Sequence, residues 1–177
     1  MEIPGLGGEA NTVDVLDEGR RLSFSYEDML RYSGPSSPGG VAHAFKVMER
    51  AFPALAGNGP LERREITVST AFGGPGARDG FELVTRAVTG DRYVLDPELA
   101  RPERGPTLER FVFRVGCAEH SVTLVLREGF VTDEFIGLAR KQRSLKEDAR
   151  LDLLKREMAA RVMANPAANV YELTGGT

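Results

Sequence analysis

The chain has little cysteine, histidine and net charge, and it contains no tryptophan. Among its 177 residues there are one cysteine and two histidines. A single cysteine, Cys117, excludes a disulfide within the chain and suits a reducing compartment, so we expect a cytoplasmic protein. The net charge is -3 and the 23 basic residues are spread along the sequence, which argues against nucleic acid as a partner.

Long hydrophobic runs are missing as well. No apolar run approaches the roughly 18 residues that a membrane span needs, so we expect no membrane partner. The N-terminal stretch MEIPGLGGEANTVDV lacks a basic region followed by a hydrophobic one, and we expect no secretory signal. What the chain does contain is 41% hydrophobic and 28% charged residues, over a length that suits one globular domain.

The order of the predicted elements favours an α+β fold, with a mixed or antiparallel sheet of about four or five strands flanked by helices. Ser25 and Asp28 predict the start of a first helix, and apolar residues at helical spacing predict a second helix after Pro38. Alternating patterns predict strands near residues 65–70, 92–95, 110–116 and 121–128, and the last two form a hairpin.

The two ends of the chain are predicted to differ. The C-terminal third predicts a long helical segment, with a break near Gly137 or Ser144 because more than 30 residues is long for one globular helix. The glycine-rich and acidic start predicts an extended arm. We therefore divide the chain into an N-terminal arm or tail, residues 1–20, and a single α+β domain, residues 21–177.

Two glycine-rich loops that lead into helices are the main candidates for a binding site. The first, YSGPSSPGG, spans Tyr32–Gly40, and the second, AFGGPGARDG, spans Ala71–Gly80. Free N–H groups and the helix dipole favour anions at such junctions. We predict a pocket between the loops, with Arg78 as the anion partner, and with these ligand-binding residues: Ser33, Ser36, Ser37, Thr70, Gly73, Gly74, Gly76 and Arg78.

Each loop also has a structural interpretation. The first is then only a helix entry with Pro38 near the first helical position, and the second is a connector in which Asp79 caps the next helix. The spacing of the second loop fits neither a dinucleotide-binding fingerprint nor a P-loop.

The two histidines and the cysteine are the remaining candidates for chemistry. His43 follows the first loop and is the one candidate for an acid/base group, although a histidine satisfied in the core is the alternative. Cys117 and His120 form C-x-x-H in a predicted turn, a spacing that can clamp a metal ion. A structural zinc site usually needs four ligands and the chain has no second cysteine, so we predict no metal and no cofactor.

The stretch FSYEDMLRYSGPSSPGGVAHAFKVMERAF resembles the opening of the FmdE-like family, which is named after one component of formylmethanofuran dehydrogenase. The residues that match the two motifs of that family are Tyr32, Gly34, Pro38, Gly39, Phe72 and Gly73. The departures fall on its metal-binding His and Cys residues, whose positions are taken here by Ser33, Pro35, Ser37 and Thr70. Hydroxyls and proline bind transition metals poorly. The resemblance covers residues 22–173 and implies the fold, the pocket location and a homodimer, in a divergent member without the metal ligands.

These observations predict binding, or metal-independent conversion, of a small polar or anionic metabolite between the two loops. Whether the chain is an enzyme stays open. A competing prediction is a non-catalytic homodimeric interaction or assembly protein, whose loops only shape the dimer interface. A third is a metal-binding protein that uses His43, Cys117 and His120.

Overall fold

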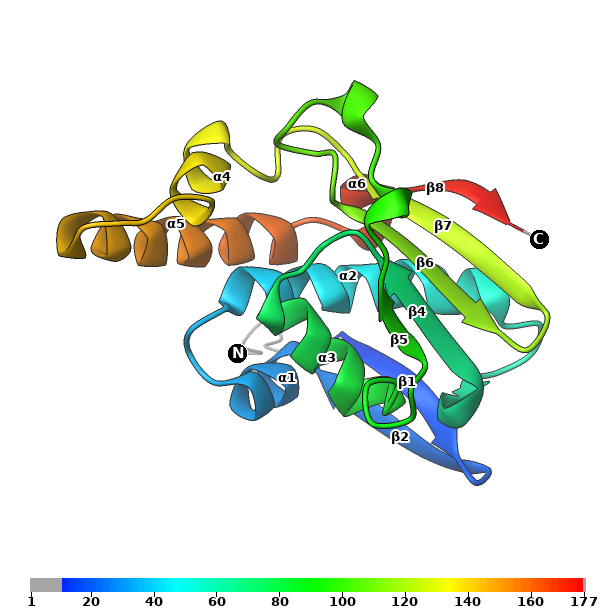
Figure 1. Cartoon of the computed structure of the whole chain (residues 1–177). Coiled ribbons are helices and arrows are strands. Elements are labelled where there is room, and N and C mark those ends of the chain that lie inside the picture. The colour runs from blue at the N-terminus through cyan, green and yellow to red at the C-terminus, as the bar shows by residue number, and fades with distance from the viewer. Residues whose placement is uncertain (1–10, 177) are drawn as a thin grey trace, which may run out of the picture.

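The computed structural model describes residues 11–176, which form helices and strands along most of their length (Figure 1). The strands are β1 (Thr12–Asp17), β2 (Arg20–Ser25), β3 (Leu61–Glu62), β4 (Ile66–Thr70), β5 (Tyr93–Leu95), β6 (Val112–Cys117), β7 (His120–Leu126) and β8 (Tyr171–Gly176). The α-helices are α1 (Tyr26–Ser33), α2 (Pro38–Leu55), α3 (Pro75–Thr85), α4 (Asp133–Ala139), α5 (Leu145–Met163) and α6 (Ala167–Val170).

The strands of the described residues form two sheets. The larger has the order β5-β4-β6-β7-β8 and the smaller has the order β2-β1-β3. In the larger sheet β4 and β5 run parallel, whereas the other neighbouring strands pair antiparallel. The predicted hairpin is present as β6 and β7, in which Cys117 lies opposite His120. A mixed sheet with flanking helices and a long C-terminal helical segment confirms the predicted α+β class.

Helix α2 is central, because it packs against α3, α5 and strands of both sheets (Figure 1). Pro38 occupies its first position, where the missing N–H would have no partner in the helix anyway. Every residue of α2 from Gly39 to Met48 is buried, as expected of a helix with neighbours on all sides. The side chains of His43 and Lys46 are buried with the rest, and each has a hydrogen-bond partner.

The N-terminal hairpin corrects the predicted arm over residues 1–20. Residues 12–17 form β1, which pairs antiparallel with β2 and parallel with β3. Val13 and Val15 of this strand are buried in the core, so the segment belongs to the domain. Residues 1–10 of the predicted arm lie outside the described residues.

Helix α3 begins inside the segment Ala71–Gly80, which the sequence predicts as a loop. The helix starts at Pro75, so Gly76 lies within its first turn. A Cβ atom at Gly76 would lie 2.3 Å from the Ser37 carbonyl oxygen, so glycine lets α3 approach α2 closely here. This tertiary contact outweighs the low helix propensity of glycine, which is why a composition typical of loops is found in a helix.

The C-terminal helical segment breaks near Ser144, as predicted. Helix α4 ends at Ala139, and α5 begins after Ser144, whose side chain forms a capping box with Glu147. Figure 1 shows α4 and the first half of α5 extending to one side of the larger sheet. Over residues 11–176, no helix is both long and apolar enough to cross a membrane.

Candidate functional site

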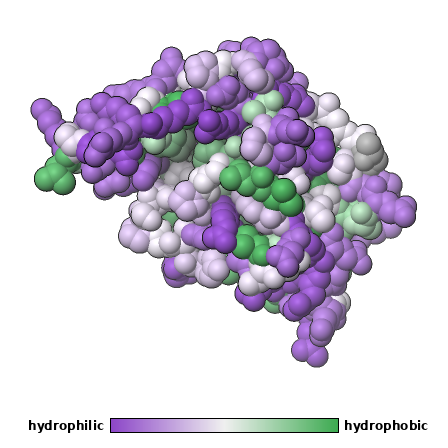
Figure 2. All heavy atoms as spheres, viewed as in Figure 1, coloured by the Kyte–Doolittle hydropathy of each residue, from purple (hydrophilic) through white to green (hydrophobic). Residues whose placement is uncertain are grey.

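A cavity of about 390 Å³ lies where the N-terminal ends of α2 and α3 meet α4 and α5; we call it the α2–α3 cavity. This is the region between the two loops in which the sequence predicts a pocket. The space-filling view shows apolar atoms recessed between the hydrophilic α4–α5 segment and the rest of the molecule (Figure 2). Of the residues predicted to bind a ligand, the cavity is lined by Ser37, Gly73, Gly74 and Gly76.

The starts of α2 and α3 lie side by side at the cavity (Figure 1). Both helices carry proline at their first position, and neither is capped by a side chain, although Ser37 occupies the N-cap position of α2. The two starts touch, because a Cβ atom at Gly40 would lie 2.9 Å from the backbone nitrogen of Ala77. Each N-terminus carries roughly half a positive charge, so the pair favours an anion at this end of the cavity.

Cationic side chains line the cavity, and among the described residues no carboxylate lines it. They are Arg110, Arg140, Arg143 and Lys155. They come from the loop before β6, from the residues between α4 and α5, and from α5 itself. A lining with several cations and no acid gives a positive potential that attracts anions.

The four cations differ in how far their donors are already used. Arg143 forms an ion pair with Asp148 at 2.7 Å and donates to the carbonyls of Leu138 in α4 and Lys141 after it, so it holds the break between helices. Lys155 Nζ donates to the Ser36 carbonyl at 3.1 Å.

The remaining two cations are the most available. Arg140 lies 3.7 Å from Glu109, a loose ion pair. Arg110 is exposed and forms no ion pair with any described residue. Arg110 and Arg140 are therefore the side chains that a bound anion would reach most readily.

The inner surface of the cavity is apolar. Phe111 and Met158 are 1% and 3% exposed, and they form part of its lining. The rings of Phe72 and Phe111 are stacked, with centroids 4.5 Å apart. Thr70 holds this arrangement, because its hydroxyl donates to the Val112 carbonyl at 2.7 Å and accepts the Phe72 N–H at 3.0 Å.

His43 lies beneath the cavity and does not line it. Its Nδ1 is 2.8 Å from the Tyr171 hydroxyl and its Nε2 is 3.4 Å from the sulfur of Met158. Because a thioether sulfur has no hydrogen to donate, Nε2 carries the hydrogen and Nδ1 accepts from Tyr171. Burial lowers the pKa of His43 to about 3, so the imidazole is neutral at physiological pH.

The other four residues predicted to bind a ligand lie outside the cavity lining. The Ser33 hydroxyl donates to Asp79 at 2.8 Å, joining the end of α1 to α3. Ser36 lies in a neighbouring hollow beside Lys155. Thr70 is fully buried, and Arg78 is exposed on α3 away from the cavity lining. The structure thus brings together the glycines and Ser37 but leaves these four side chains outside the cavity.

The three residues of the predicted metal site do not meet. Cys117 and His120 face each other across the β6–β7 hairpin, and the Cys117 thiol lies 4.0 Å from a carboxylate oxygen of Glu65. His43 instead contacts Tyr171 in the core. Over residues 11–176, no group of three His, Cys, Asp or Glu side chains is arranged to hold a metal ion.

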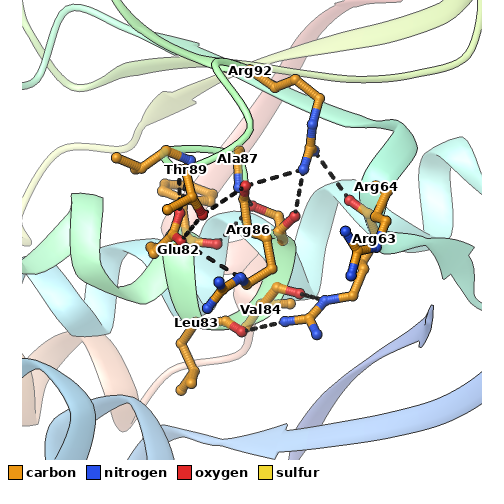
Figure 3. A network of polar contacts seen from close by, with 12 residues as sticks. Arg63, Arg64, Glu82, Leu83, Val84, Arg86, Ala87, Thr89 and Arg92 are labelled. Atoms are coloured by element: carbon orange, nitrogen blue, oxygen red, sulfur yellow. Dashed lines mark hydrogen bonds and ion pairs between the residues drawn. The ribbon is translucent and has the colours of Figure 1, made fainter.

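A second arginine cluster surrounds the C-terminal end of α3, away from the cavity (Figure 3). Arg63 donates to the carbonyls of Val84 and Leu83 at 2.9 and 2.7 Å. Arg92 donates to the carbonyl of Thr85 at 3.0 Å and to that of Arg86 at 3.1 Å. The two guanidinium groups therefore satisfy carbonyls that have no partner within the helix.

Glu82 completes this cluster (Figure 3). Its carboxylate accepts the backbone N–H groups of Val88 and Thr89 at 2.8 and 3.1 Å. Burial alone would raise the pKa of Glu82, but the hydrogen bonds from Thr89 and Val88 hold it below its usual range. The whole cluster is closed by internal hydrogen bonds, so it has a structural role.

Sequence reasoning missed the four cations of the α2–α3 cavity. The basic run that begins at Arg140 was visible, but it reads equally well as the solvated surface of a helix. Arg110 lies in a loop with no motif.

No family model matches this sequence, and a search of curated proteins gives no significant match.

Proposed function

We propose that this protein binds a small anionic metabolite in the α2–α3 cavity. The observation that carries the proposal is a lining that combines two uncapped helix starts with four cations and, among the described residues, no carboxylate. Backbone N–H groups and guanidinium groups are the donors that carboxylates and phosphates prefer. Arg110 and Arg140 take the role that the sequence predicts for Arg78.

The geometry favours binding over conversion of the ligand. A general acid or base must reach the reacting group, either directly or through one water. His43 is buried, is neutral at physiological pH and already contacts Tyr171 and Met158. We assign it a role in positioning Met158 under the cavity.

The resemblance to the FmdE-like family supports the place of the site. That resemblance puts its ligand positions at Ser33, Pro35, Ser37 and Thr70, and of these Ser37 lines the cavity, together with Phe72 and Gly73 of the second motif. It remains a prediction for this chain. The hydroxyl and proline substitutions at the metal positions favour an organic or inorganic anion over a metal ion.

A thermal-shift screen tests the proposal. The purified protein is melted with phosphate, sulfate, simple carboxylates and phosphate monoesters, at constant ionic strength. We expect at least one anion to raise the melting temperature, because a ligand that binds only the folded state stabilises it. Arg110→Gln should reduce the shift, whereas Arg114→Gln, on the exposed face of β6, should keep it. No shift with any anion would contradict the proposal.

A homodimer is the second candidate. Strand β5 is at an edge of the larger sheet, and its Val94 and Leu95 are 50% and 56% exposed. Green, apolar atoms gather near this edge in Figure 2. Exposed apolar residues on an edge strand favour association with a second copy. Leu95→Glu should lower the mass measured by light scattering from that of a dimer to that of a monomer; a wild-type monomer would contradict this candidate.

A further inference from the structure

The α2–α3 cavity changes in polarity with depth. Phe111, Met158 and Leu151 of its lining are 1%, 3% and 4% exposed, so they form its floor. Arg110 and Arg140 are exposed, so they lie at its rim. A molecule that fills the cavity therefore meets apolar surface at its inner end and positive charge at its outer end.

Three aromatic rings belong to the apolar part of the lining. The stacked pair Phe72 and Phe111 has an interplanar angle of 25°. Phe135 of α4 lines the same cavity and is only partly buried. Flat aromatic surfaces in a binding site favour planar apolar groups, because stacking adds to the gain from removing both surfaces from water.

The size of the cavity argues against a simple inorganic anion as its natural occupant. A volume of about 390 Å³ falls in the range typical of sites for organic ligands. One water molecule occupies roughly 30 Å³ of liquid. Phosphate or sulfate at the rim would leave the partly exposed rings of Phe72 and Phe135 in contact with water, and the free energy of burying these rings would not be gained.

We propose that the ligand is an amphipathic anion, a planar apolar ring that carries a phosphate or a carboxylate. The ring would lie against Phe72, Phe111 and Phe135, and the anionic group would meet Arg110 and Arg140. This inference rests on the proposed anion-binding function and adds the apolar half of the ligand to it.

Calorimetric titration with four small probes tests the inference. Phenyl phosphate and benzoate carry both a ring and an anion, inorganic phosphate carries only the anion, and benzyl alcohol carries only the ring. We expect phenyl phosphate or benzoate to bind at least tenfold tighter than either single-feature probe. Comparing the two ring anions shows whether the site prefers phosphate or carboxylate.

Matched variants locate the two halves of the site. Phe135→Ala should weaken binding of the preferred ring anion about fivefold, within the range of aromatic contacts, and leave inorganic phosphate unchanged. Arg110→Gln should weaken the binding of every anion, and Arg114→Gln should weaken the binding of none. Melting curves check that each variant folds.

Three results would overturn the inference. Equal affinity for inorganic phosphate and phenyl phosphate, with no effect of Phe135→Ala, would support anion binding but contradict the inference that the ligand carries an apolar ring. Benzyl alcohol that binds as tightly as phenyl phosphate would indicate an apolar pocket and contradict both the inference and the proposed function. Failure of all four probes to bind would also count against both.

Discussion

The two ends of helix α3 each gather arginines, but they use them in opposite ways. At the C-terminal end, Arg63 and Arg92 place their donors on backbone carbonyls, and the cluster is closed. At the N-terminal end, Arg110 and Arg140 line an open cavity and have few or loose partners. A guanidinium whose donors are used by the backbone stabilises the fold, whereas one whose donors face a cavity is available to a ligand.

Removing an arginine from the closed end should have the largest effect. Arg92→Met leaves the carbonyls of Thr85, Arg86 and Ile66 without this donor. We expect a loss of about 3 kcal/mol in the free energy of unfolding, because several partly buried acceptors lose their hydrogen bonds. Urea denaturation measures it, with Arg114→Met as the control on an exposed strand face. A loss below about 1 kcal/mol would show that water replaces the guanidinium. The arginines at the two ends of α3 would then not differ in their effect on stability.

The open end depends on close backbone contact, which Gly76→Ala should break. The new Cβ would lie 2.3 Å from the Ser37 carbonyl oxygen, which is backbone and cannot turn away. We expect a loss of about 2.5 kcal/mol in the free energy of unfolding. The control is Gly137→Ala in α4, where an added Cβ meets nothing within 4 Å. It should raise stability by up to about 1 kcal/mol, and equal losses in both variants would contradict the prediction.

His43, which is buried beneath the α2–α3 cavity, should make the stability of the fold depend on pH. Burial lowers the pKa of His43 to about 3 from an ordinary value of 6.5, so below pH 6.5 the unfolded chain takes up a proton that the folded chain does not. The stability that the neutral, buried His43 contributes to the fold is complete above pH 6.5 and is lost as the pH falls toward 3. We expect a loss of about 2 kcal/mol between pH 7 and pH 5.

Denaturation of His43→Gln at both pH values provides the check. This variant should be less stable at pH 7, and its stability should change less between pH 7 and pH 5. An unchanged pH dependence in His43→Gln would assign the effect to other groups.

The smallest change in stability is expected at the cations of the open end. Arg110→Gln and Arg140→Gln should each change the free energy of unfolding by no more than about 0.5 kcal/mol, because Arg110 is exposed without an ion pair to any described residue and the loose pair between Arg140 and Glu109 contributes little. Their affinity for the bound anion should fall about tenfold, the effect of one charged hydrogen bond. Losses of unfolding free energy near that of Arg92→Met would mean that the arginines at both ends of α3 stabilise the fold.

Much of the fold could be predicted because its signals are local. The capping box of Ser25 and Asp28, the hairpin of β6 and β7, and the break at Ser144 each depend on residues a few positions apart. Strand β1 was missed although its main pairing is a local hairpin with β2, because the charges around Val13 and Val15 resemble a tail.

The position of the candidate site could be predicted, but most of its charged residues could not. The two glycine-rich loops pointed to the starts of α2 and α3, and these starts do meet at a cavity. Arg78, the predicted anion partner, lies on the outer side of α3. Arg110 and Arg140 reach the cavity only because the loop before β6 and the α4–α5 segment pack against it.

The sequence by itself determined where α1, α2 and α5 begin, because proline geometry, caps and apolar spacing act within one or two turns. It also determined that the starts of α2 and α3 have similar sequences, both rich in glycine and proline. Only the tertiary structure decided that they touch, that Gly76 is helical, and which arginines face an open cavity. The reason is that a cavity is assembled by packing between segments far apart in the chain, and no local pattern records which side chain points into it.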